Sequence, residues 1–390
     1  MVYLLVASSS TVMEEQLFMH CKDGELSFNW IMTDEQLREE ADSWACLSAI
    51  GLDTEFQRTN TFYPIPALYQ VSADGNLFLI DPFGISDWSP FIACLSNPNI
   101  IKVMHACMED LELISHHLNI VPTSIFDTQL ANAFQQPEYA ISYARLVDNF
   151  HRIELAKGET RSDWLQRPLT DKQIKYALED VIYLEPLYEV LSARLKSLDR
   201  ESWFLDMMLR RATYLPSNPD TYYRKNKKAW ALEQSELRRL KLLTAWREKT
   251  AMNENVPRKR IVWDEHLLEM TKLERLREEH IVEILPNGIA TRYGDELIKV
   301  HVEAGVSKEF VEPISAPLTR HEAKISKLLR GIAIEQAESL SVAKELLARK
   351  QDAEDCIRYF KMFGKLPEEY LGWRHSIVGE NFLDTLREKL

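Results

Sequence analysis

The chain has 390 residues, of which 45% are hydrophobic and 27% are charged. This composition is ordinary for globular proteins and excludes long disordered stretches, a collagen-like chain and a coiled-coil rod. A typical domain has roughly 150 residues, so we expect two or three domains. The formal net charge of −13 argues against a generic nucleic-acid coat, which requires a broad excess of lysine and arginine. It does not exclude a nucleic-acid enzyme, because a site for divalent metal requires carboxylates of its own.

The cysteines do not form a pattern typical of a disulfide framework or a thiolate zinc site. Their number is odd, and no two stand in a Cys-x-x-Cys pair. We therefore expect reduced thiols in a cytoplasmic protein. The apolar run at the N-terminus is too short for a signal peptide, and no later stretch reaches the roughly 18 apolar residues of a membrane span. We expect no membrane association.

Apolar runs of strand length fill the first part of the chain. Residues 49–56, 67–71 and 77–80 are predicted strands, and the turn-forming segments between them indicate an antiparallel meander. Short apolar stretches at 100–105 and 124–126 each precede a segment with helical periodicity. The first part is therefore predicted to be an α/β domain with a mixed sheet.

Beyond about residue 170 the strand signal ends and helical periodicity takes over. Proline-containing breaks fall at 216–219 and near 313–317. The fold class is therefore predicted to be α/β plus all-α. The predicted parts are an N-terminal extension of unknown role at 1–28, the α/β domain at 29–215, and two small helical domains at 216–308 and 309–390.

The first candidate site lies in the predicted strand 49–56, at Asp53 and Glu55. Side chains two positions apart in a strand project from the same face, so both carboxylates point in one direction. Two carboxylates side by side in a hydrophobic strand repel each other and lose hydration, and a divalent cation is the simplest way to offset that cost. The alternative is a solvent-facing edge strand that carries two ordinary acids.

A second candidate is Asp110, at the start of the helical segment that follows the strand 100–105. Helix capping and the helix dipole also favour an acid there, so a helix cap is the alternative to a metal ligand. His105 and Cys107 stand nearby, but two ligands without further partners are a poor basis for a zinc site.

A third candidate is the pair Tyr176 and Asp180, in a helix predicted to begin after Thr170 as its N-cap. At i, i+4 spacing the phenol and the carboxylate are neighbours on one face of the helix. The alternative is a tyrosine that packs on the core beside a surface acid.

The order of these signals resembles the three motifs of the DEDD exonucleases, and the tyrosine is that of the DEDDy branch. The order is Asp-x-Glu in a first strand, His-Ala-x-x-x-Asp, and Tyr-x-x-x-Asp in a late helix. Further segments make the chain similar to bacterial ribonuclease D: Phe62-Tyr-Pro64, Leu79-Ile-Asp-Pro82, Phe126-Asp-Thr-Gln129 and 162–169. Residues from 230 to about 268 resemble an HRDC domain, and Leu371-Gly-Trp-Arg374 resembles a motif of a second, more divergent HRDC-like unit.

The resemblance covers about residue 30 to the C-terminus. The preceding residues are either a true extension or the result of a start codon placed too early, with Met13, Met19 and Met32 downstream. The first HRDC-like segment also lacks a proline that the resemblance leads us to expect near Lys272. Neither departure touches the proposed site.

The resemblance implies a ribonuclease-H-like exonuclease domain followed by two small HRDC-like domains. The catalytic residues that it implies are Asp53, Glu55, Asp110, Tyr176 and Asp180. The four acids would hold two divalent cations, Mg²⁺ or Mn²⁺, and Tyr176 would orient the attacking water. The implied activity is that of a 3′–5′ exoribonuclease that releases 5′-mononucleotides and matures the 3′ ends of tRNA precursors and other structured RNAs. A 3′–5′ DNA exonuclease and a non-catalytic RNA-binding scaffold are the alternatives.

Seven basic residues are candidates for RNA binding, since an acidic catalytic domain needs compensating charge to hold phosphates. They are Arg167, Lys225, Lys227, Lys228, Arg258, Lys259 and Arg260. A solvated helix surface is the alternative for the clusters beyond residue 220. Near Arg167, Trp164 is expected to pack in the core. The expected protein is a cytoplasmic monomer with RNA, and especially tRNA precursors with 3′ trailers, as its partner.

Overall fold

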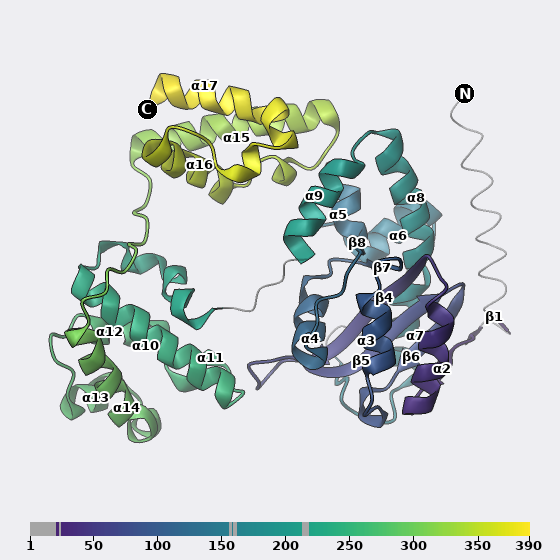
Figure 1. The fold of residues 1–390 in the computed structure, drawn as a ribbon, viewed down its shortest axis with the longest axis horizontal. Coiled ribbons are helices and arrows are strands. Elements are labelled where there is room, and N and C mark those ends of the chain that lie inside the picture. The colour runs from purple at the N-terminus through teal and green to yellow at the C-terminus, as the bar shows by residue number, and fades with distance from the viewer. Residues whose placement is uncertain (1–20, 23–24, 156–157, 159–161, 213–217) are drawn as a thin grey trace. The chain divides into compact units, whose positions relative to one another are not determined.

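The computed structural model describes residues 21–22, 25–155, 158, 162–212 and 218–390. The chain forms two compact units, each of which contains more than one segment of the sequence (Figure 1). The first unit comprises Met1–Gln57, Pro66–Tyr214 and Leu318–Leu390, and the second comprises Arg58–Ile65 and Leu215–Pro317. The loop that follows the strand with Asp53 and Glu55 therefore belongs to a different unit from these acids.

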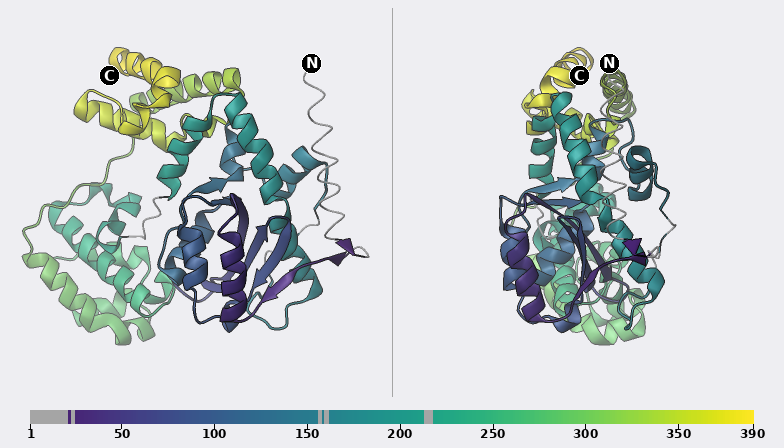
Figure 2. Two further views of the ribbon diagram at one scale, coloured as in Figure 1. Left: turned by 45° about the vertical axis from the view of Figure 1, so that its right-hand side comes forward. Right: turned by 90° about the vertical axis from the view of Figure 1, so that its right-hand side faces the viewer.

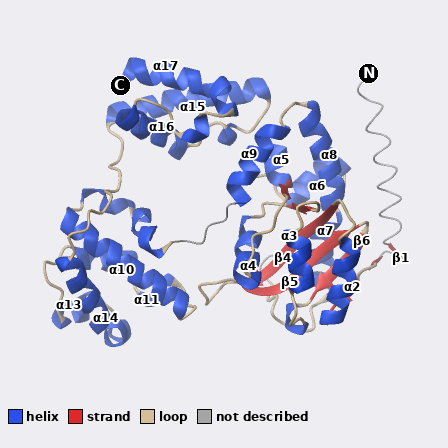
Figure 3. Cartoon of the chain, viewed as in Figure 1, coloured by secondary structure: helices blue, strands red, loops and turns tan. Residues whose placement is uncertain are grey.

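The first unit is built on a six-stranded mixed sheet with the strand order β3-β6-β5-β4-β7-β8. Figure 3 shows the strands in red. The strands are β3 (Asn29–Ile31), β4 (Ala49–Gln57), β5 (Ile65–Ala73), β6 (Asn76–Ile80), β7 (Ile101–Met104) and β8 (Ile125–Asp127). Strands β5 and β6 pair antiparallel, whereas β3 with β6, β4 with β7, and β7 with β8 pair parallel. A separate pair, β1 (Cys21–Lys22) and β2 (Glu25–Leu26), is antiparallel. The predicted mixed sheet is confirmed, and the three strands of the predicted meander are neighbours in it.

Helices surround this sheet in the first unit and make up most of the second (Figure 2). Those of the first unit are α2 (Asp34–Trp44), α3 (Ser89–Ser96), α4 (Met108–Leu118), α5 (Thr128–Ala133), α6 (Tyr143–His151), α7 (Asp171–Ile182), α8 (Leu184–Ser197), α9 (Glu201–Ala212), α15 (Arg320–Leu340), α16 (Lys350–Phe363) and α17 (Glu380–Lys389). Those of the second unit are α10 (Gln234–Asn253), α11 (Arg258–Ile261), α12 (Asp264–Thr271), α13 (Glu278–Ile284) and α14 (Asn287–Val306), preceded by the 3-10 segments η2 (Pro219–Lys225) and η3 (Lys227–Ala231). None of the described helices is long and apolar enough to cross a lipid bilayer.

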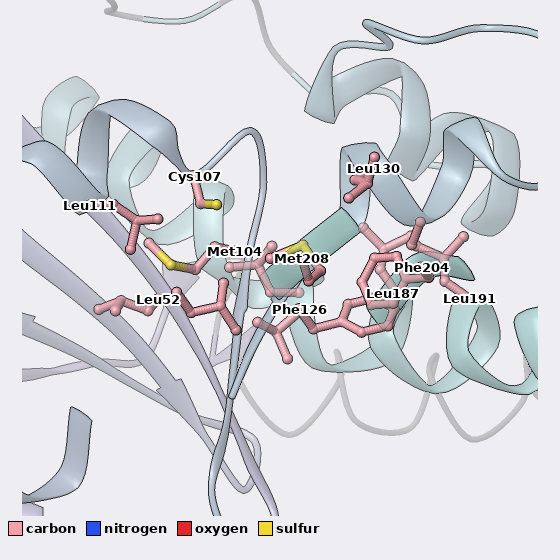
Figure 4. Close-up of a cluster of buried hydrophobic side chains, with 14 of the residues drawn as sticks. Leu52, Met104, Cys107, Leu111, Phe126, Leu130, Leu187, Leu191, Phe204 and Met208 are labelled. Atoms are coloured by element: carbon pink, nitrogen blue, oxygen red, sulfur yellow. The ribbon is translucent and has the colours of Figure 1, made fainter. Parts of the chain in front are cut away.

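The core beside the central strands consists of apolar side chains from β4, β7 and β8 that face helices α8 and α9 (Figure 4). Leu52 and Met104 are fully buried there. Phe126 of β8 meets Phe204 of α9 with 4.7 Å between the ring centroids. Strands β4, β7 and β8 are parallel, and apolar side chains of each are buried against the helices. The buried core fixes β4, and with it the backbone that carries Asp53 and Glu55.

Gly51 allows three elements to meet just before the acidic pair. A Cβ atom at this position would lie 2.3 Å from the Ser72 hydroxyl oxygen on β5 and 2.9 Å from Cβ of Leu184 on α8. Because real Cβ atoms do not approach other atoms so closely, any larger residue would push α8 away from the sheet.

The C-terminal helices pack on the same unit as the sheet. The indole rings of Trp203 and Trp373 are stacked, with 5.0 Å between centroids and an interplanar angle of 11°. The Arg200 guanidinium donates to the carbonyl oxygens of Phe134 at 2.5 Å and Leu340 at 2.6 Å. The C-terminal helical part, predicted as a domain of its own at 309–390, thus shares a compact unit with the α/β part.

Candidate active site

Three carboxylates meet at the centre of the sheet: Asp53 and Glu55 of β4 and Asp180 of α7. One carboxylate oxygen of each lies within 4.8 Å of the corresponding oxygens of the other two. The two strand acids share a face because they are two residues apart, as predicted. Asp180 joins them because α7 packs against β4. This is the one such acidic cluster among the residues that the structure describes.

The start of α7 is fixed by a capping box. The Thr170 hydroxyl accepts a hydrogen bond from the backbone N–H of Gln173, whose side chain in turn binds the backbone N–H of Thr170. The predicted N-cap is therefore confirmed, and it sets the helical phase for the residues that follow. Ala177 and Val181 turn to the core, so that Asp180 lies at the edge of the buried face.

The cluster is electrostatically unfavourable without a cation. Burial, and then the charges of Asp110 and Asp180, hold the pKa of Asp53 well above its ordinary value. Burial and the neighbouring carboxylates raise the pKa of Glu55 to about 9. Burial also raises the pKa of Asp180 to about 7, although a hydrogen bond with Tyr176 opposes this rise. Such shifts are expected where carboxylates are brought together to hold a positive charge.

The fourth predicted acid, Asp110, lies beside this cluster and is only 8% exposed. It is in the first turn of α4, whose N-cap is Cys107, so it is not the capping residue. Instead its carboxylate accepts a hydrogen bond from the Thr54 hydroxyl. Burial raises the pKa of Asp110 to about 7. Its charge acts on Asp53 and Glu55, but its oxygens are not part of the group of three.

Tyr176 lies over the cluster, and its hydroxyl is hydrogen-bonded to the Asp180 carboxylate. Burial, and then the charge of Asp180, raise the pKa of Tyr176, so the phenol keeps its proton. Gly158 packs against the ring, because a Cβ atom there would be 1.8 Å from Cε2 of Tyr176. Gly158 was not predicted as a site residue. A single glycine in a loop gives no indication in the sequence that it packs against a distant ring.

A second tyrosine, Tyr143 of α6, is near the acids and was not predicted. Its pKa is raised by burial and then by the charges of Asp180 and Asp53. Its hydroxyl accepts a hydrogen bond from the backbone N–H of Tyr183 at 3.2 Å. The ring contacts His105 edge to face, with 5.5 Å between centroids. Tyr143 therefore belongs to the wall of the site.

The turn that leads to Asp110 is held by a buried ion pair. Ala106 has a positive φ of 55°, and its N–H donates to the Asp127 carboxylate at 3.1 Å. Arg211 of α9 donates to the other oxygen of Asp127 at 2.5 Å. Asp127 is fully buried, so an unpaired charge there would be costly. The segment that contains Asp127 was noted as part of the family resemblance, but nothing in the sequence pointed to Arg211 as its partner.

His105 makes structural hydrogen bonds rather than contributing to the acidic cluster. Its two ring nitrogens contact the Thr128 hydroxyl at 2.9 Å and the Ile141 carbonyl at 3.1 Å. Cys107 is buried, and its thiol contacts Asp127 at 3.6 Å.

Comparison with known proteins identifies the family. The chain is 36% identical to ribonuclease D of Pseudomonas paraeruginosa, over 92% of this chain and 97% of that protein. It is 30% identical to ribonuclease D of Escherichia coli, over 93% of this chain and 99% of that protein. The chain belongs to the ribonuclease D family.

The fold agrees with this membership. The crystal structure of Escherichia coli RNase D, described as an exoribonuclease involved in structured RNA processing, matches with a TM-score of 0.85 and 29% identity, over 93% of this chain and 99% of that chain. The family model described as 3′–5′ exonuclease matches residues 28–196, and the HRDC domain model matches residues 236–300. The predicted fold class is confirmed. The protein is an enzyme of the ribonuclease D type, a 3′–5′ exonuclease that hydrolyses phosphodiester bonds.

The donor set of this site suits a hard divalent cation. Asp53, Glu55 and Asp180 offer only carboxylate oxygens, which Mg²⁺ and Mn²⁺ prefer, whereas zinc sites favour nitrogen and sulfur. A divalent cation would also neutralise the charges whose mutual repulsion raises these pKa values.

Arg167, one of the seven basic candidates, makes structural hydrogen bonds in the first unit. Its guanidinium donates to both oxygens of Asp81, at 2.6 and 2.9 Å, and to the Ala67 carbonyl at 2.7 Å. The remaining nitrogen donates to the carbonyls of Trp164 and Gln166. Trp164 is 2% exposed, which confirms that it packs in the core. Because all the nitrogens of Arg167 are occupied, we do not include it in the proposed RNA interface.

The other six basic candidates lie in the second unit and differ in exposure. Lys227, Lys228 and Lys259 are exposed. Lys225 and Arg258 lie over the ring of Tyr222, with 4.3 and 4.6 Å to its centroid. Arg260 is exposed and donates to the side chain of Asn60.

Proposed function

We propose that this enzyme degrades RNA from the 3′ end by two-metal hydrolysis and releases 5′-mononucleotides. The observation that carries the proposal is the meeting of Asp53, Glu55 and Asp180, with Asp110 beside them. These four acids would hold two divalent cations, Mg²⁺ or Mn²⁺. Such a pair of cations supplies an activated water and stabilises the leaving oxygen of an in-line displacement.

In this proposal Tyr176 orients the attacking water through its hydroxyl. The hydroxyl is already hydrogen-bonded to Asp180, and its raised pKa keeps it protonated. A protonated phenol can position a water molecule by hydrogen bonding, but it is not the base that removes the proton. The raised pKa therefore supports a positioning role for Tyr176.

The proposed substrates are structured RNAs, in particular tRNA precursors with 3′ trailers. The names of the Pseudomonas and Escherichia relatives support RNA as the substrate, and the Escherichia protein is described as acting in structured RNA processing. Five basic residues of the second unit are exposed and would contact phosphates: Lys225, Lys227, Lys228, Lys259 and Arg260. We further propose that the enzyme acts as a monomer in the cytoplasm.

Two other functions remain as alternatives. A DNA exonuclease would use the same acids, since they act on the phosphodiester. A non-catalytic RNA-binding scaffold is opposed by the presence of all five motif residues, from Asp53 to Asp180.

The test is an RNA labelled at its 3′ end, incubated with Mg²⁺ or Mn²⁺ and either the parent enzyme or the Asp53→Asn variant. Release of labelled mononucleotide by the parent alone would support the proposal. Equal digestion of single-stranded DNA of the same sequence would favour a DNA exonuclease, and RNA binding without any release would favour a scaffold.

A further inference from the structure

The second unit contains a cavity of about 560 Å³, and none of the acids of the active site lines it. Its walls come from the loop 58–65, from η2 and α10, and from α11 with the start of α12. This volume is typical of sites that hold a small ligand. Its lining combines cationic and aromatic side chains, including Arg58, Arg258 and Trp263.

The floor of the cavity is a paired and buried charge network. Arg247 is 2% exposed and donates to Glu248 at 3.1 Å and to Asp264 at 2.5 Å. Arg258 donates to the other oxygen of Glu248 at 2.6 Å. Its guanidinium also lies 4.5 Å from the centroid of the Phe62 ring. Because these charges satisfy one another, the floor is rigid without a ligand.

The loop that forms one wall is fixed to the helices. The backbone N–H groups of Phe62 and Tyr63 both donate to the Asn255 side-chain oxygen at 3.1 Å. Phe62 is 5% exposed and is part of the hydrophobic core of this unit. The cavity is thus a built feature of the unit and not a gap between mobile segments.

The rim presents an aromatic plane beside a cation. Trp263 is 48% exposed, so its ring is accessible from solvent. The Lys259 ammonium lies 5.3 Å from the centroid of the Trp263 ring and is exposed. Two acids, Asp264 and Glu265, also line the cavity, but Arg247 neutralises Asp264. With Arg58 and Arg258 included, the lining has a net positive charge.

We propose that this cavity binds one unpaired nucleotide of an RNA strand. The base stacks on Trp263, and Lys259 holds the adjacent phosphate, with Arg58 adding positive charge. Stacking on an aromatic side chain beside a cation suits every base, because each has a π-face. The inference rests on the proposed function in taking RNA as the substrate.

The position of this loop in the chain fits a role in holding substrate. Arg58 follows Glu55 by three residues, so their Cα atoms are at most about 11 Å apart. Only two residues separate Arg58 of this loop from Glu55 in the chain.

The experiment measures RNA binding separately from hydrolysis. The full chain with Asp53→Asn is titrated in EDTA against a fluorescent single-stranded oligouridine, and anisotropy gives Kd. Adding Trp263→Ala is expected to raise Kd by about tenfold or more. Adding Lys259→Ala is expected to reduce the slope of log K against log salt concentration by about 0.7, the value for one phosphate contact to a single strand.

The controls are Trp230→Ala and Lys272→Ala, which change residues of the same unit that do not line the cavity. Trp230 is 47% exposed and so matches Trp263 in accessibility. The inference would be overturned if Kd stayed unchanged in the Trp263 variant and the salt slope stayed unchanged in the Lys259 variant. It would also be overturned if the control variants changed Kd and the salt slope equally. If Trp263→Ala does not fold, the salt slope of the Lys259→Ala variant still tests the inference, because Lys259 is exposed. Failure of the parent to release mononucleotides, with binding dependent on Trp263, would count against the proposed function alone.

Discussion

The Thr54 hydroxyl donates a hydrogen bond to the Asp110 carboxylate, and this contact connects β4 to α4 beside the acidic cluster. Thr54 stands between Asp53 and Glu55 in the strand, and it is 6% exposed. The hydrogen bond favours the charged form of Asp110 and opposes the effect of burial on its pKa. The strand that supplies two of the acids therefore also orients a third.

Thr54→Val should weaken metal binding, because it removes the donor that holds the Asp110 carboxylate in position. Changes in residues that orient metal ligands cost about 10- to 100-fold in affinity, and we expect a loss near the lower value. Calorimetric titration with Mn²⁺ measures it. Thr54→Ser keeps the hydroxyl and is the matched control. Equal affinities in the valine variant and the parent would show that Thr54 has no such role.

Asp180→Asn should abolish most of the activity and also stabilise the metal-free protein. Loss of a carboxylate that would hold a cation at the reacting phosphate should reduce kcat by roughly 10²- to 10³-fold, because the cation stabilises the charge of the transition state. The substitution removes the repulsion between the Asp180 carboxylate and the carboxylates of Asp53 and Glu55. The Tm of the metal-free protein, measured in EDTA, should therefore rise. Asp171→Asn, an exposed acid on the same helix, is the control. A lower Tm in EDTA for Asp180→Asn would contradict this account.

Tyr176→Phe should lower kcat by about 10²-fold, because the ring remains while the hydroxyl that would orient the water is lost. KM should change little, since the phenylalanine ring still packs against Gly158. Single-turnover kinetics with a short RNA separate the two effects. Tyr188→Phe on α8 is the control, because it removes a tyrosine hydroxyl outside the cluster. A change in KM alone would argue that Tyr176 binds substrate rather than orienting water.

Stabilisation by metal should increase with pH. Glu55 has a pKa of about 9 in the folded protein against an ordinary value of 4.5, and Asp110 and Asp180 have about 7 against 3.8. The folded state therefore binds more protons than the unfolded state between these values, so the metal-free protein loses stability as pH rises from about 4 to about 9. Mg²⁺ replaces these protons, so it should bind most strongly at pH values at which the carboxyl groups have already lost them.

Thermal unfolding with and without Mg²⁺ at about pH 6 and about pH 8 tests this linkage. The rise in Tm caused by Mg²⁺ should be larger at the higher pH. Glu55→Gln should make the rise in Tm depend less on pH, because it removes the carboxyl group whose pKa is raised to about 9. If Mg²⁺ raised Tm equally at both pH values, the carboxyl groups of the metal-free site would not be protonated as described.

Trp373→Ala should loosen the C-terminal helices from the α/β part of the first unit. The indole stacks on Trp203, and its N–H donates to Asp206 at 3.2 Å. Truncation of a packed tryptophan costs about 3 kcal/mol. Urea unfolding should show this loss, while Trp230→Ala, at an exposed site in the other unit, should change the free energy of unfolding little. Equal stability of the two variants would mean that the stacking contributes nothing.

Most of the local structure around the site could be predicted from the sequence. The alternation of β4 places Asp53 and Glu55 on one face, and helical spacing places Tyr176 one turn before Asp180. The N-cap at Thr170 is readable for the same reason, since it depends only on residues within one turn. The role of Asp110 was harder to predict. In the sequence, an acid that caps a helix cannot be distinguished from a buried acid of the site until its contact with the neighbouring strand is known.

The sequence by itself determined the order and spacing of the motifs, because strand and helix periodicity are properties of the local backbone. Only the tertiary structure decided which distant groups meet. It joined Asp180 to β4, paired Arg211 with Asp127, and turned Arg167 inward to Asp81. It also assigned the loop 58–65 to the unit of the HRDC helices. Such pairings depend on how whole elements pack to bury their apolar faces, and residue spacing along the chain does not encode that packing locally.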